Sequence, residues 1–203
     1  MMLKKKIVSK NKMGKFEKDG SEKIVFQGKI IQVVNQPMVL NNKKIIFEIA
    51  RRSPGVRLII RKDNKFLLTK EHRYETNDFD YRLPGGKVFD TLEEYKKTLN
   101  DKNNLMKYAK DAAKKECIQE TGLKANKISY YKTSKAGATI ESDLLYFLIT
   151  DFTYNEQKLE EGEIIKPEWK SVNEIKKLII NSKMKEDRSV GVFVQYLMTE
   201  KLF

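Results

Sequence analysis

The stretch of sequence that decides the fold is Ala112-Ala113-Lys114-Lys115-Glu116-Cys117-Ile118-Gln119-Glu120-Thr121-Gly122-Leu123. The pattern predicts a helix over residues 105–121 that ends at Gly122, because glycine commonly follows a helix C-terminus. On that helix Glu116 and Glu120 are four residues apart and share one face. Two carboxylates one turn apart offer the hard oxygen ligands that Mg²⁺ or Mn²⁺ prefers. Taken alone, the helix also fits an ordinary solvent-exposed Glu/Lys surface.

A second stripe of this helix is small and apolar. Ala109, Ala113 and Cys117 recur at intervals of four, which is typical of a face packed into a core. Upstream, Tyr81-Arg82-Leu83-Pro84-Gly85-Gly86-Lys87-Val88 predicts a tight bend. The pair Gly85-Gly86 has the conformational freedom to turn the backbone inward, although a plain turn is the alternative interpretation.

The rest of the chain predicts strands alternating with helices. Strands are expected at 24–26, 29–34, 44–49, 56–60, 66–69, 128–132 and 144–150, and further helices at 172–180 and 189–201. This order indicates an α/β or α+β sandwich. We expect a flexible basic tail over residues 1–20, a small antiparallel β-domain over 21–52 and a main domain over 53–203.

The composition fits a folded protein and narrows its function. The 203 residues are 40% hydrophobic and include no apolar run near the ~18 residues that span a membrane. The first residues lack the apolar centre of a signal peptide, so we expect a cytoplasmic protein with no membrane contact. Cys117 is the only cysteine, which excludes an internal disulfide and a cysteine-based zinc cluster.

The net charge of +13 hints at nucleic acid. Only seven of the 41 basic residues are arginine, however, and the lysines are scattered among many asparagines. We therefore favour a solvated exterior and an anionic small-molecule substrate, and leave a nucleic-acid partner open without favouring it.

The bend and the helix together resemble the signature of the Nudix hydrolase family, G-x5-E-x7-R-E-U-x-E-E-x-G-U, where U is aliphatic. Gly86 takes the position of the opening glycine, and the matching helix residues are Glu116, Cys117, Glu120, Gly122 and Leu123. Four further segments are similar to the ADP-ribose pyrophosphatase branch: Phe26–Lys29, Glu71–Tyr74, Ala136–Glu141 and Glu160–Ile165. The resemblance implies a Nudix-type α/β/α sandwich with a mixed sheet, preceded by the small antiparallel β-domain.

The resemblance also implies a set of site residues. The expected metal ligands are Glu116, Glu120 and the main-chain carbonyl oxygen of Gly85. The expected catalytic residues are a general base from an acidic stretch and the lysine at the signature's arginine position: Glu160, Glu161, Glu163 and Lys115. The expected substrate-binding residues are Arg51, Arg52, Arg73 and Glu141. A guanidinium suits this role because it donates two hydrogen bonds at once to a phosphate.

The sequence departs from the signature in several places. Gly86 and Glu116 are 30 positions apart, twice the family spacing, and we expect the insertion between Asp90 and Lys107 to form a surface loop. Lys107 stands where the first glutamate belongs, and Glu93 or Glu94 is its substitute. The other changes are Lys115 for arginine, Gln119 for a glutamate and Ala136 for the branch's loop proline.

The function implied is metal-dependent hydrolysis, with Mg²⁺ or Mn²⁺, of a nucleoside diphosphate linked to another moiety. ADP-ribose, giving AMP and ribose 5-phosphate, is the leading substrate. A nucleotide sugar or a dinucleoside polyphosphate is the second hypothesis. The third is an inactive Nudix module that binds nucleotide or RNA. Relatives pair through their N-terminal strands, so the resemblance also implies a homodimer.

Overall fold

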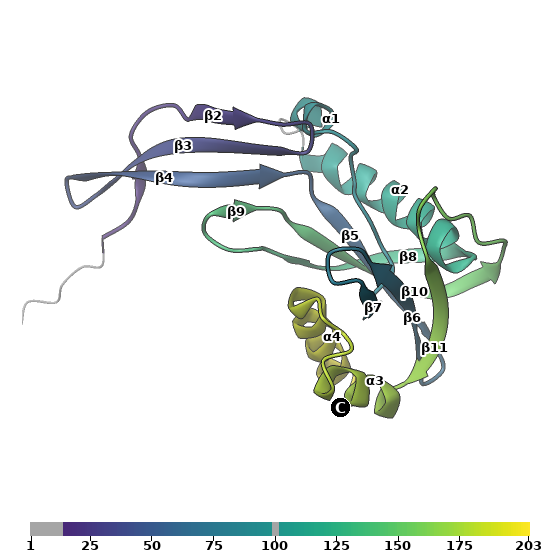
Figure 1. The fold of residues 1–203 in the computed structure, drawn as a ribbon. Helices are drawn as coiled ribbons and strands as arrows, with labels where there is room; N and C mark the ends of the chain where they lie inside the picture. Colours follow the sequence, from purple (N-terminus) through teal and green to yellow (C-terminus); the bar gives the residue numbers. More distant parts are fainter. Residues whose placement is uncertain (1–13, 99–101) are drawn as a thin grey trace, which may run out of the picture.

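The computed structural model describes residues 14–98 and 102–203, which form two β-sheets and four helices (Figure 1). The predicted basic tail lies largely outside the described residues. Near its end, Glu17–Lys18 form strand β1, and the ring of Phe16 lies 5.1 Å from that of Phe47. None of the described helices is long and apolar enough to cross a membrane.

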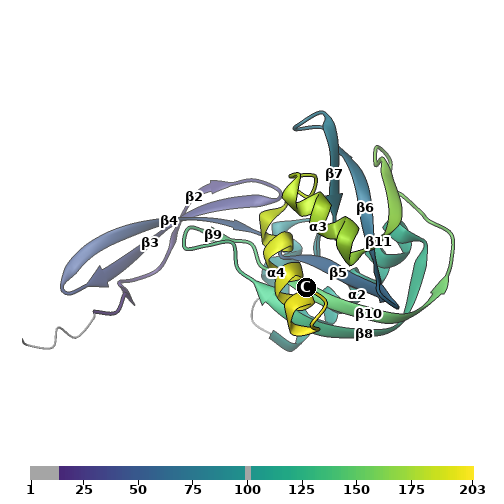
Figure 2. The same ribbon diagram turned by 90° about the horizontal axis from the view of Figure 1, so that it is seen from below.

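The first sheet forms an arm that extends away from the rest of the molecule (Figures 1 and 2). Its strands are β1, β2 (Lys23–Gln27), β3 (Ile31–Leu40), β4 (Lys43–Arg52) and β9 (Ile140–Glu141). The β3–β4 hairpin turns at Asn41 and Asn42, whose positive φ angles of 50° and 64° suit a two-residue hairpin turn. Strand β9 comes from the second half of the chain and pairs in parallel with β4.

The second sheet is mixed, as expected. Its order is β11-β6-β5-β10-β8, with β7 paired to β6. The strands are β5 (Gly55–Lys62), β6 (Lys65–Arg73), β7 (Asp78–Arg82), β8 (Leu123–Ser134), β10 (Leu144–Tyr154) and β11 (Ile165–Ser171). Strands β5 and β10 pair in parallel, and the other pairs are antiparallel.

Helices cover both faces of this sheet, which confirms the α/β/α sandwich. Helix α2 (Lys102–Thr121) covers one face, where the small stripe Ala109, Ala113 and Cys117 is fully buried. Helices α3 (Val172–Ile180) and α4 (Asp187–Thr199) cover the other face. The alternation of side chains along β5 divides its apolar residues between the two cores.

The prediction of a surface loop between Asp90 and Lys107 was wrong over most of its length. Helix α1 spans Leu92–Thr98, and helix α2 already begins at Lys102, while residues 99–101 lie outside the described residues. The helix α1 forms because Thr91 and Glu94 make reciprocal side-chain to main-chain hydrogen bonds, the capping-box arrangement. Much of the insertion therefore adds helix and leaves the signature helix intact.

Candidate active site

A cavity of about 860 Å³ opens beside the C-terminal half of α2. Of the residues predicted from the sequence, it brings together Arg52, Arg73, Gly85, Lys115, Glu116, Glu120, Glu160 and Glu163. Three predicted residues do not line it: Arg51, Glu141 and Glu161. The cavity is therefore bounded by the glycine bend, by the signature helix α2 and by the acidic loop, the segment that contains Glu160, Glu161 and Glu163. This is the arrangement that we expected from the sequence.

The paired carboxylates of α2 face this cavity. Glu120 is only 5% exposed, and its Oε2 accepts a hydrogen bond of 2.7 Å from the main-chain N–H of Gly85. Burial raises the pKa of Glu116 to about 7. Burial, together with repulsion from Glu71 and Glu116, raises the pKa of Glu120 well above its ordinary value. Within the described part of the chain neither signature carboxylate has an ion-pair partner.

The bend fits against these carboxylates only because its residues are glycines. Gly85 has a φ of 143°, and a side chain there would also overlap the carbonyl of Val56. A Cβ on Gly86 would overlap the carboxylate of Glu116. The bend is held to strand β5, since the N–H of Val56 donates to the Gly86 carbonyl at 2.9 Å.

The donor set fits a divalent cation. A buried anion without a partner is costly, and a hard cation held by Glu116, Glu120 and the Gly85 carbonyl would offset that cost. The side-chain oxygen of Gln119 is also buried without a hydrogen-bond partner. No three His, Cys, Asp or Glu side chains among the described residues form a metal centre by themselves. A cation here therefore needs main-chain or substrate oxygens in addition.

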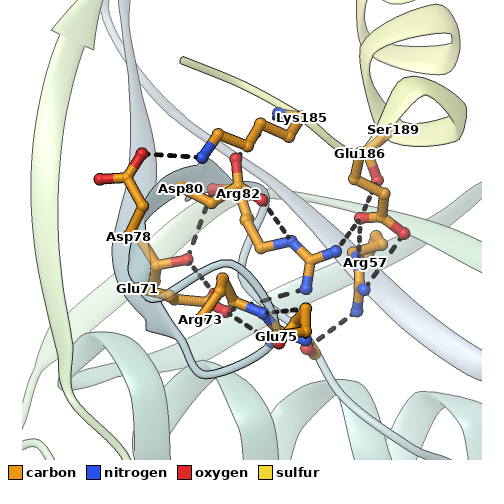
Figure 3. Close-up of polar contacts among 12 residues, drawn as sticks. Arg57, Glu71, Arg73, Glu75, Asp78, Asp80, Arg82, Lys185, Glu186 and Ser189 are labelled. Atoms are coloured by element: carbon orange, nitrogen blue, oxygen red, sulfur yellow. Dashed lines mark hydrogen bonds and ion pairs between the residues drawn. The ribbon is translucent and has the colours of Figure 1, made fainter. Parts of the chain in front are cut away.

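A charged network that the sequence did not reveal forms another wall of the cavity (Figure 3). Arg57 and Arg82 both point toward Glu186, the residue that precedes α4, at 2.9 and 3.7 Å. Arg82 also lies 3.2 Å from Asp80 and 3.9 Å from the buried Glu71. A signal for Arg57 existed, because it is a charge inside an apolar strand, and such a charge needs a partner.

The pKa values of this network follow its pairing. Burial raises the pKa of Glu71, and the Thr69 hydroxyl and Arg82 only partly oppose it. Burial also acts to raise the pKa of Glu186, but Arg57 outweighs it and holds that pKa below its ordinary value. The pKa of Arg57 is raised, because pairing with Glu186 outweighs the effect of burial. The Arg57–Glu186 pair is therefore ionised.

The acidic loop contributes two carboxylates to the cavity, Glu160 and Glu163. The Oε1 of Glu160 lies 3.6 Å from the Lys115 ammonium and accepts from the Gln119 amide at 3.5 Å. The Oε2 of Glu163 accepts from the main-chain N–H of Glu160 at 2.9 Å. The loop is thus in contact with the signature helix through residues that depart from the family pattern.

The predicted arginines separate into two groups. Arg51 pairs with Glu22 at 2.7 Å and with Glu141 at 2.6 Å, so its charge is neutralised by ion pairs at the arm. Arg52 and Arg73 line the cavity. Arg73 pairs with Glu75 at 2.8 Å and lies 3.6 Å from Glu71.

The two glutamates named as substitutes for the missing signature glutamate also have observed contacts. Glu94 lines the cavity, but its carboxylate caps α1 by accepting from the main-chain N–H groups of Asp90 and Thr91. Glu93 is exposed and pairs with Lys97 at 3.3 Å.

Comparison with known proteins agrees with this geometry. The family model of the NUDIX domain matches residues 51–189, more than half of the chain. A solved structure described as "Crystal structure of ADP compounds hydrolase" is similar, with a TM-score of 0.68 and 15% identity over 95% of this chain and 98% of that chain. At that identity the likeness shows the fold alone. No curated protein matches the chain significantly.

A mixed-sheet sandwich in which two helix carboxylates face a glycine bend defines the Nudix class. The chain belongs to the Nudix family and is a Nudix pyrophosphohydrolase. This confirms the resemblance found in the sequence. Nudix hydrolases generally use divalent metal ions, in agreement with the donor set described above.

Proposed function

We propose that this enzyme hydrolyses a nucleoside diphosphate linked to another moiety, with ADP-ribose, giving AMP and ribose 5-phosphate, as the leading substrate. The observation that carries the proposal is the pair Glu116, half-buried, and Glu120, buried, which lie beside the glycine bend with no cationic side chain of the described residues paired to them. The similar solved structure is described as an ADP compounds hydrolase, which supports a substrate with an ADP moiety.

The chemistry divides between a cation and the chain's own residues. Mg²⁺ or Mn²⁺ held by Glu116, Glu120 and the Gly85 carbonyl would neutralise phosphate charge and make an attacking water more acidic. Arg52 and Arg73 bind phosphate oxygens from the cavity wall, because a guanidinium donates paired hydrogen bonds to them. This arrangement holds the scissile diphosphate against the signature helix.

The general base comes from the acidic loop, and Glu160 and Glu163 are its candidates because both line the cavity. The variants Glu160→Gln and Glu163→Gln test them, with Glu161→Gln as a matched control outside the cavity. Loss of a general base lowers kcat by ~10²–10⁴-fold and changes the acidic limb of the pH profile. A loss confined to the control would contradict the assignment.

Release of phosphate-containing products across a substrate panel, with Mg²⁺ and with Mn²⁺, tests the proposed reaction. The panel contains ADP-ribose, nucleotide sugars and dinucleoside polyphosphates. We expect turnover of ADP-ribose that Glu120→Gln removes and that Glu93→Gln, an exposed control on α1, retains. Faster turnover of a nucleotide sugar or a dinucleoside polyphosphate than of ADP-ribose supports the second hypothesis, in which one of these is the substrate. No turnover with either metal, together with RNA binding that weakens steeply with salt, supports the inactive module.

A homodimer formed through the arm is also proposed. The arm exposes apolar side chains: Ile24 (51%), Val25 (50%), Phe26 (55%) and Ile46 (63%). Three of these residues are consecutive on β2, and exposed apolar side chains that lie together favour a protein interface. Light scattering is expected to give the mass of two chains for the wild type and of one for Ile46→Asp. Ile180→Asp is the control, since Ile180 is exposed on α3, away from the arm.

We propose a cytoplasmic location as well. Cys117, the only cysteine, is buried and unpaired, which suits a reducing compartment. Fractionation of the source cells with an antibody against the protein tests this placement, and recovery in an oxidising extracellular fraction would contradict it.

A further inference from the structure

Arg57 makes an unusual contact with the glycine bend. Its side chain, 11% exposed, leaves the apolar strand β5 and lines the cavity. The Nη1 group donates to the main-chain carbonyl of Gly85 at 2.9 Å and to that of Val56 at 3.0 Å. The Gly85 carbonyl is the same oxygen that the proposed function assigns to the cation.

The guanidinium itself is held from the C-terminal part of the chain. Glu186 accepts from the Nε of Arg57 at 2.9 Å and from its Nη2 at 3.3 Å, a two-point pair that fixes the guanidinium plane. The hydroxyl of Ser189, in the first turn of α4, donates to Glu186 at 2.8 Å and lies 3.3 Å from the buried hydroxyl of Tyr146. These contacts connect the first turn of α4 to the bend, and Figure 3 shows the part formed by Ser189, Glu186 and Arg57.

The bend needs such an external restraint. Two consecutive glycines place little steric limit on the rotation of the peptide plane between them. The N–H of Gly85 is held by Glu120, and the carbonyl of Gly86 is held by Val56. The carbonyl of Gly85 has a hydrogen bond from Arg57, and a carbonyl oxygen keeps a second lone pair for another partner.

We propose that Arg57 is a positioning residue for the cation site: paired to Glu186, it fixes the Gly85 carbonyl so that the free lone pair of this oxygen is available to a divalent cation. This inference rests on the proposed function. It gives the C-terminal helix a role in the site, because Glu186 and Ser189 orient the guanidinium. It also gives a reason for the Arg57 guanidinium to lie beside a site that binds a divalent cation, although the two positive charges repel each other.

Loss of the Arg57 charge and loss of its hydrogen bond to the Gly85 carbonyl predict opposite changes in cation affinity, which makes the proposal testable. Removing the positive charge of Arg57 from the cavity would, by Coulomb's law alone, tighten the binding of a cation. Loss of the carbonyl restraint would weaken it, by ~10-fold on the scale of other outer-shell contacts. The double variant Arg57→Met/Glu186→Gln leaves the net charge unchanged and avoids a Glu186 carboxylate that has lost its closest cation and keeps only Arg82, at 3.7 Å.

Mn²⁺ binding, measured without substrate by the electron paramagnetic resonance signal of the free ion, is the test. The variants are Arg57→Met, the double variant and Glu120→Gln. Arg61→Met is the matched control, since Arg61 lies on the same strand, pairs with Glu200 at 3.0 Å and does not line the cavity. The carbonyl ¹³C resonance of Gly85 in metal-free protein is a second readout, and thermal unfolding checks that each variant is folded.

We expect Mn²⁺ affinity to fall ~10-fold in Arg57→Met and in the double variant, and to stay unchanged in the control. The Gly85 carbonyl resonance is expected to move in Arg57→Met and in the double variant and to stay unchanged in the control Arg61→Met. Unchanged or tighter Mn²⁺ binding by the double variant overturns the proposal. A raised KM with unchanged Mn²⁺ affinity also overturns it, because Arg57 would then be a substrate ligand. Wild-type Mn²⁺ binding that is indifferent to Glu120→Gln overturns the cation site of the proposed function itself.

Discussion

Replacing Glu116 by glutamine is expected to stabilise the metal-free protein while removing its activity. Burial raises the pKa of Glu116 from 4.5 to about 7. Between these two pH values the folded state binds more protons than the unfolded state, so stability falls as pH rises. This loss of stability, caused by the buried charge on Glu116, is almost absent at about pH 4.5 and complete above about pH 7.

The size of the effect follows from the shift. A shift of about 2.5 pKa units corresponds to about 3 kcal/mol, and partial access of water to the side chain reduces this to roughly 1–3 kcal/mol. Glutamine keeps the shape of the side chain and carries no charge, so Glu116→Gln removes the penalty. The variant should therefore be more stable than the wild type by that amount at about pH 8 and nearly equal to it at about pH 4.5.

Urea unfolding in the presence of a chelator, at both pH values, measures this difference. Glu93→Gln is the control, because Glu93 lies exposed on α1 and only pairs with Lys97. Addition of Mg²⁺ at the higher pH should stabilise the wild type and not Glu116→Gln, since a ligand of the folded state adds to its stability. A variant no more stable than the wild type at about pH 8 would refute the reasoning, as would a difference of equal size at both pH values.

Three further predictions concern the glycine bend, the signature helix and helix α1. Gly86→Ala places a methyl group against the carboxylate of Glu116 and should lower the free energy of unfolding by no more than ~1 kcal/mol in thermal or urea unfolding, because this carboxylate is the movable end of a flexible side chain. Gln119→Glu should tighten Mn²⁺ binding in a titration, because a carboxylate is a stronger ligand than an amide; weaker binding would show that the side chain does not reach the cation. Leu92→Ala, at a fully buried position of α1, should cost ~2–5 kcal/mol, and a negligible cost would mean that α1 does not pack as described.

Local patterns were enough to predict the signature helix, the bend and strands β5, β6, β8 and β10 of the second sheet, but strands β7 and β11 of that sheet were missed. The end of α2 is an example: Gly122 takes a φ of 65°, and the last helical residue is Thr121. The spacing of Ala109, Ala113 and Cys117 likewise gave the buried face correctly. In these cases the deciding forces act between residues one or two helical turns apart, so they can be recognised in the sequence.

The charged wall of the cavity could not be predicted in this way. Arg57 and Glu186 are 129 residues apart, and their pairing depends on the packing of α4 onto the second sheet. The same holds for Arg51, which meets Glu141 only because β9 returns to the arm and pairs with β4. The missed α1 is different, since Thr91 and Glu94 carried a local capping signal that the polarity of the insertion obscured.

Two of the departures from the Nudix signature on α2 converge on one atom of the acidic loop. Lys115 and Gln119 both contact the Oε1 of Glu160. A second carboxylate at position 119 would repel Glu160 at this distance, whereas an amide N–H₂ group donates to it. Glutamine therefore gives up a carboxylate and gains a contact with the loop from which we propose that the general base comes. The departures are consistent with an active enzyme whose loop is held against the helix, because the carboxylates that remain, Glu116 and Glu120, are the pair that faces the glycine bend.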